Sequence, residues 1–68
     1  MPPKIRQLKA ELTKAGFISR AAKGSHTCWE HLKYPDLYIT ISGRDGDDAQ
    51  KYQERDVKKL LKEVEKRR

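Results

Sequence analysis

A short alternating run, Leu37-Tyr38-Ile39-Thr40-Ile41, constrains the fold of this chain more than any other stretch. Successive side chains of a β-strand point to opposite faces of a sheet. Leu37, Ile39 and Ile41 therefore share an apolar face, whereas Tyr38 and Thr40 share the opposite face. The apolar face of such a strand must be covered, so the rest of the chain has to supply the covering elements.

Two amphipathic helices, one near each end of the chain, are predicted to cover that face. Over residues 4–15 and over about residues 53–66, apolar side chains recur at the spacings of three and four that place them on one helical face. Gly16 is expected to end the first helix in a left-handed conformation. The sequence leaves open whether the second helix begins earlier, near Ala49. The apolar stripes consist of Ile5, Leu8, Leu12 and Ala15, and of Val57, Leu60, Leu61 and Val64.

Two more strands are expected between the helices. They are Phe17-Ile18-Ser19-Arg20 and residues 25–32, joined by a turn over residues 21–24, and a second turn places Pro35 and Asp36 at its centre. The order α-β-β-β-α predicts a single α+β domain over residues 1–68. In this fold a three-stranded antiparallel sheet carries both helices on one face.

The composition of the chain limits which binding partners and which cellular compartment are expected. A chain of 68 residues buries only about 60% of the surface of its unfolded form, so modest stability is expected. The formal charge of +6 favours polyanions as ligands. Cys28 is the only cysteine, which excludes an internal disulfide and fits a reducing compartment. With no signal peptide or long apolar run in view, we expect a cytoplasmic protein that does not bind membranes.

The residues best suited to chemistry follow one another in Lys23-Gly24-Ser25-His26. Lysine attracts phosphate, a serine hydroxyl donates to phosphate oxygen, and glycine lets the backbone approach a ligand. Histidine suits proton transfer near neutral pH. Cleavage of RNA by its own 2′-hydroxyl needs such a base and cations for the phosphate, but no metal. His26 is therefore the candidate catalytic residue, and Arg20, Lys23, Gly24 and Ser25 are candidate RNA-binding residues; alternatively, His26 only begins a strand and caps a turn.

Other chemically capable residues receive structural roles. On a strand over residues 25–32, His26 and His31 lie on opposite faces and roughly 16 Å apart, too far to act as an acid–base pair. We expect His31 at the surface, Cys28 as a small buried residue, and Trp29 in the core, with stacking on an unpaired base as the alternative. The diverging side chains of His26, Cys28 and His31 do not predict a metal site, and the acidic loop 42–48 lacks the spacing of a calcium-binding loop. No cofactor is expected.

Several of these residues also give the chain a resemblance to HicA-type toxins, the small mRNA interferases of type II toxin–antitoxin systems. The resemblance implies a fold like that of double-stranded-RNA-binding domains and metal-independent cleavage of mRNA with His26 as the catalytic residue. It also implies a HicB-type antitoxin that covers the active site. The matching stretches are Leu8-Lys9, Leu12, Lys14-Ala15-Gly16-Phe17, Lys23-Gly24-Ser25-His26 and Trp29, followed by the weaker Asp56-Val57-Lys58-Lys59-Leu60-Leu61-Lys62.

The chain departs from that family pattern at two places. Ser42-Gly43-Arg44 stand where HicA-type toxins often carry a proline and a histidine. Glu54-Arg55-Asp56 stand where a Gly-Thr pair is expected before the last helix. Two alternatives to the toxin therefore remain: a non-catalytic basic RNA-binding module of the same fold, and a protein-interaction domain.

Overall fold

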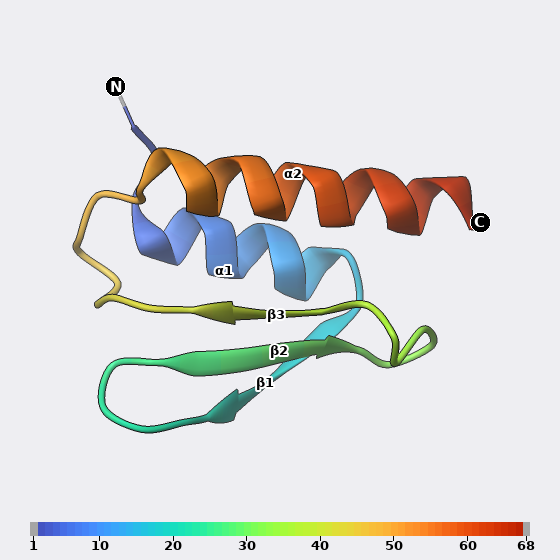
Figure 1. Cartoon of the computed structure of the whole chain (residues 1–68), viewed down its shortest axis with the longest axis horizontal. Coiled ribbons are helices and arrows are strands. Elements are labelled where there is room, and N and C mark those ends of the chain that lie inside the picture. Colours follow the sequence, from blue (N-terminus) through green and yellow to red (C-terminus); the bar gives the residue numbers. More distant parts are fainter. Residues whose placement is uncertain (1, 68) are drawn as a thin grey trace.

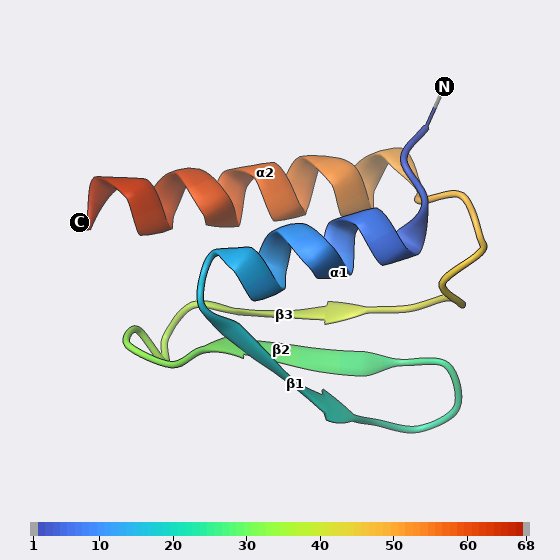
Figure 2. The same ribbon diagram turned by 180° about the vertical axis from the view of Figure 1, so that it is seen from behind.

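The computed structural model describes residues 2–67 and has the predicted element order. The three strands form one antiparallel sheet in the order β1-β2-β3, and both helices lie on the same side of it (Figure 1). The view from behind shows the opposite side of the sheet without a covering helix (Figure 2). The α-β-β-β-α prediction is thus confirmed. The elements are α1 (Ile5–Lys14), β1 (Phe17–Ala21), β2 (Thr27–His31), β3 (Tyr38–Ile41) and α2 (Lys51–Lys66).

The core lies between the helices and the sheet and is built from the predicted stripes. Leu12, Ile41 and Val57 are completely buried there, one from α1, one from β3 and one from α2. Burying one such side chain contributes about 1.5–3 kcal/mol, so a few contacts account for much of the stability of a domain this small. The buried apolar residues are Ile5, Leu8, Leu12, Phe17, Trp29, Leu37, Ile41, Ala49, Val57 and Val64.

Trp29 belongs to this core, as predicted. Its side chain is buried on the helix-covered face of the sheet, and its indole N–H donates to the Thr27 hydroxyl at 2.9 Å. The polar edge of the ring is therefore satisfied within the sheet. Stacking of Trp29 on an RNA base is incompatible with this position.

Cys28 and His31 correct two predictions. Cys28 is exposed, because it alternates with the buried Trp29 and lies on the uncovered face. His31 lies two residues after Trp29, on the same face of β2, and is buried, with 6% of its surface exposed. Its Nδ1 accepts hydrogen bonds from the backbone N–H groups of Lys33 and Tyr34, and its Nε2 lies 2.9 Å from the carbonyl oxygen of Ala15. The ring is therefore a neutral structural group that donates from Nε2.

The acidic loop between β3 and α2 caps α1. The backbone carbonyls of Asp47 and Asp45 accept hydrogen bonds from the N–H groups of Ile5 and Arg6. These are first-turn amides that have no partner inside the helix. Two side-chain ion pairs add to this cap: Lys4 with Asp48 at 2.5 Å, and Lys9 with Asp45 at 2.7 Å.

Element boundaries differ slightly from prediction. The helix predicted over residues 4–15 spans Ile5–Lys14, and α2 begins at Lys51, before the predicted residue 53. Gln53 explains the second shift, because its side-chain oxygen accepts from the N–H of Gln50 at 2.8 Å and caps the helix two residues earlier. Glu54-Arg55-Asp56 therefore lies inside α2. These residues do not occupy the position before the helix where the Gly-Thr pair was expected.

Candidate functional site

The β1–β2 connection holds four of the five predicted site residues. The residues Lys23, Gly24 and Ser25 form a three-residue loop, closed by a hydrogen bond from the N–H of Ala22 to the carbonyl of His26 at 3.0 Å. β1 continues to Ala21, and β2 begins only at Thr27. The predicted turn at residues 21–24 and strand at 25–32 are thus shifted, and both Ser25 and His26 belong to the turn.

Gly24 serves the turn through its backbone conformation. Its φ is +66°, a left-handed value that favours glycine. A Cβ placed on it would meet nothing within 4 Å. Close packing therefore does not require the glycine, and the backbone of the turn is open to a ligand from solvent.

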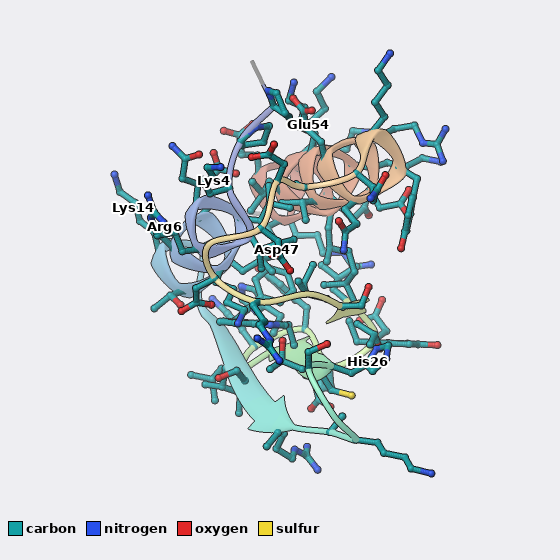
Figure 3. All side chains as sticks on the ribbon, turned by 90° about the vertical axis from the view of Figure 1, so that its left-hand side faces the viewer. Lys4, Arg6, Lys14, His26, Asp47 and Glu54 are labelled. Carbon is teal, nitrogen blue, oxygen red and sulfur yellow. The ribbon has the colours of Figure 1, made fainter. Side chains whose placement is uncertain are left out.

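His26 is exposed and lies one residue before β2. Figure 3 looks onto this end of the molecule and places His26 at the level of the sheet, away from Lys4, which precedes α1, and from Arg6 and Lys14 on α1. Among residues 2–67, no hydrogen bond involves its ring. The imidazole is accessible for proton transfer, but a bound substrate would have to supply its orientation.

Arg20 extends the positive charge of the turn along β1. Its Cα is paired with that of Cys28, and its guanidinium lies 3.7 Å from the carboxylate of Glu30. The Arg20 side chain is 75% exposed and that of Glu30 is 44% exposed. An ion pair so open to water contributes little, so Arg20 can exchange Glu30 for a phosphate.

The second histidine of the chain, His31, is buried away from the turn. His31 is committed to its structural hydrogen bonds. Within the described part of the chain, no group of three His, Cys, Asp or Glu side chains could hold a metal ion. Glu30 follows His26 by four residues, roughly 13 Å along the strand. The geometry therefore supports chemistry centred on one imidazole.

A second basic region, not singled out from the sequence, runs along the solvent face of α2. Five cations line a hollow of about 580 Å³ there, together with Glu54. Their spacing of four, three, one and three residues places them on one helical face, which is the signal that could have identified them. Glu54 pairs with Lys58 at 3.5 Å. The cations are Lys51, Arg55, Lys58, Lys59 and Lys62.

A bidentate ion pair lies at the end of the molecule opposite the turn (Figure 1). Arg67, at the end of α2, donates two hydrogen bonds of 2.9 and 2.8 Å to the carboxylate of Asp36. These hydrogen bonds hold the pKa of Asp36 below its ordinary value and raise the pKa of Arg67. The pair fastens the helix end to the β2–β3 turn and takes no part in the candidate site.

Over residues 2–67, no helix is both long enough and apolar enough to cross a membrane. No protein-family model, no curated protein and no solved structure matches this chain.

Proposed function

We propose that this protein is a metal-independent endoribonuclease that cleaves mRNA, and that it acts as the toxin of a HicA/HicB-type toxin–antitoxin system. The observation that carries the proposal is the exposure of His26 in a turn that also presents Lys23, with Arg20 on the adjoining strand. The α-β-β-β-α fold is the one that the resemblance to HicA-type toxins implies.

In the proposed reaction, a neutral His26 ring removes the proton of an RNA 2′-hydroxyl. The 2′-oxygen attacks the adjacent phosphorus and the bond from phosphorus to the 5′-oxygen breaks. The leaving 5′-oxygen takes up a proton from water, and His26 releases the proton it gained to solvent. The products carry a 2′,3′-cyclic phosphate and a 5′-hydroxyl. Lys23 and Arg20 stabilise the negative charge on the phosphate, and N–H groups of the turn at Gly24 and Ser25 are open to its oxygens.

One positioned proton carrier typically contributes about 10²–10⁴-fold to a rate. This modest gain suits an enzyme whose substrate is abundant mRNA. Because His26 and Lys23 are exposed in the turn, a protein partner that covers them would silence the enzyme. The proposed partner is an acidic HicB-type antitoxin that covers His26 and Lys23, in keeping with the net charge of +6.

Controlled expression in bacterial cells tests this proposal. The wild-type protein is expected to arrest growth, and His26→Ala is expected to abolish the arrest at equal protein level. Lys33→Ala, which removes an exposed lysine from the β2–β3 connection, is the matched control and should arrest growth like the wild type. Equal arrest by the wild type and His26→Ala would exclude the catalytic role.

A non-catalytic RNA-binding module is the second candidate, and the α2 cations favour it. A binding module held by α2 would lose RNA affinity in the Lys59→Ala/Lys62→Ala variant, and the slope of log affinity against log salt would fall by about 0.7 per lost phosphate contact. The proposed enzyme instead predicts this fall for Lys23→Ala. Fluorescence anisotropy with labelled RNA at several salt concentrations separates the two.

A further inference from the structure

The uncovered face of the sheet carries a set of side chains that neither the core nor the proposed reaction uses. Cross-strand pairing arranges them in two rows, Ile18–Glu30–Tyr38 and Arg20–Cys28–Thr40. Side chains directly opposite each other in such rows have Cβ atoms about 4.5–5.5 Å apart. They line a hollow of about 270 Å³ on the face turned away from the helices.

Tyr38 is the prominent member of this set. Its surface is 72% exposed, whereas Ile41, on the opposite face of the same strand, is completely buried. A large aromatic ring left open on a sheet offers a flat apolar surface to a ligand. Ile18, in the same row, is 44% exposed and adds an aliphatic surface across the hollow.

We propose that this face binds a single-stranded segment of RNA, with one unpaired base stacked on Tyr38. Flat aromatic rings on an open sheet face accept unstacked bases, and the contact tolerates any base because every base has a π-face. The hollow is smaller than the roughly 300–1,000 Å³ of pockets that enclose drug-sized ligands, and so suits one base.

The polar residues around Tyr38 fit the same ligand. Glu30 is paired with Tyr38 across the strands and can accept hydrogen bonds from the amino groups of a base. Arg20 lies in the neighbouring row, towards the turn, and can bind the following phosphate. A protein partner is less well matched, because the face offers only two large apolar side chains, Ile18 and Tyr38, around a charged pair.

The position of Tyr38 relates the base to the reacting phosphate. Its partner Glu30 follows His26 by four residues, which is roughly 13 Å of extended chain. Glu30 lies on β2 and Tyr38 lies beside it on β3, so a short single-stranded segment can reach from the turn to Tyr38. The inference deepens the proposed function: it names single-stranded RNA as the substrate class and assigns Tyr38 as a binding residue.

The test measures binding separately from cleavage. The probe is a fluorescently labelled, single-stranded 2′-O-methyl RNA, which has no free 2′-hydroxyl and is not cleaved. Tyr38→Ala should weaken its binding by about 5- to 150-fold, the usual effect of losing one base–aromatic stack. Tyr38→Phe should bind as the wild type does. Tyr52→Ala removes a tyrosine that is 52% exposed on α2 and is the matched control with unchanged affinity.

A second measurement keeps the test valid if the Tyr38→Ala variant does not fold. Tyr38→Trp keeps an aromatic ring, and the only natural tryptophan, Trp29, is buried. Fluorescence quenching of Tyr38→Trp by the single-stranded probe, but not by a duplex of the same sequence, is expected.

Unchanged affinity in a folded Tyr38→Ala variant, or no quenching in Tyr38→Trp, would overturn the inference even if RNA is cleaved. Conversely, an affinity that depends on Tyr38, with no cleavage of ordinary RNA, would support this binding site and contradict the proposed ribonuclease activity.

Discussion

His31 joins three segments of the chain through one imidazole ring. Its nitrogens bond the end of α1 at Ala15 and the β2–β3 connection at Lys33 and Tyr34, and its ring packs edge-on against Phe17 at 4.9 Å between centroids. Gly16 completes the corner. Its φ is +103°, and a Cβ added to it would lie 3.0 Å from Nε2 of His31.

Gly16→Ala is therefore expected to destabilise the protein more than Gly24→Ala. Both substitutions force alanine into a left-handed conformation, which costs about 1–3 kcal/mol. Only at Gly16 does the new methyl group also press on a buried ring, whereas at Gly24 it meets open space. Urea unfolding of both variants measures the difference. Equal losses of unfolding free energy would contradict the assigned role of the His31 corner.

The residue scale also shows what sequence could and could not predict. The alternation of residues 27–31 places Trp29 and His31 on one face and Cys28 on the other, so burial of Trp29 already places His31 on the covered face. The predicted surface position of His31 is wrong, because the ring lies on the face of the sheet that the helices cover. The hydrogen bonds that satisfy the ring involve Ala15, Lys33 and Tyr34. No local sequence pattern predicts this tertiary arrangement.

At the scale of elements, helices and strands follow from periodicity, but their ends are set by specific caps. The order and the apolar faces were predictable, because each depends on a repeated spacing. The start of α2 depends on one side chain, Gln53, that reaches back to Gln50. The start of β2 depends on the Ala22–His26 hydrogen bond that closes the turn. Such single contacts compete with propensity and shift boundaries by one or two residues.

The C-terminal end of α2 gives a pH-dependent prediction. Hydrogen bonds from Arg67 lower the pKa of Asp36 in the folded protein. The stabilisation is therefore present above the ordinary pKa of 3.8 and is lost as the pH falls through the lower folded value. Asp36→Asn should reduce Tm slightly at neutral pH, since the pair is exposed, and have no effect at strongly acidic pH. A Tm difference that persists in acid would contradict this assignment.

At the scale of the molecule, the two layers divide positive charge between two surfaces. The helix layer carries the α2 cations on its outer side, and the sheet layer carries Arg20 and the turn with Lys23 and His26. The composition predicts an anionic partner. It does not show where that partner binds, because the net charge does not tell which surface carries the cations. The grouping of Lys23, Gly24, Ser25 and His26 was predictable since they are adjacent in sequence. The α2 surface and the open face around Tyr38 required the fold.

The most direct test of the central claim is incubation of purified protein with mRNA in the presence of EDTA. The wild type should cleave the RNA and leave 2′,3′-cyclic phosphate ends, whereas His26→Ala should cleave about 10²–10⁴-fold more slowly. Because His26 is exposed and makes no side-chain hydrogen bond among residues 2–67, the variant should unfold at the same urea concentration. Intact RNA with the wild type, or equal cleavage by a folded His26→Ala variant, would contradict the account.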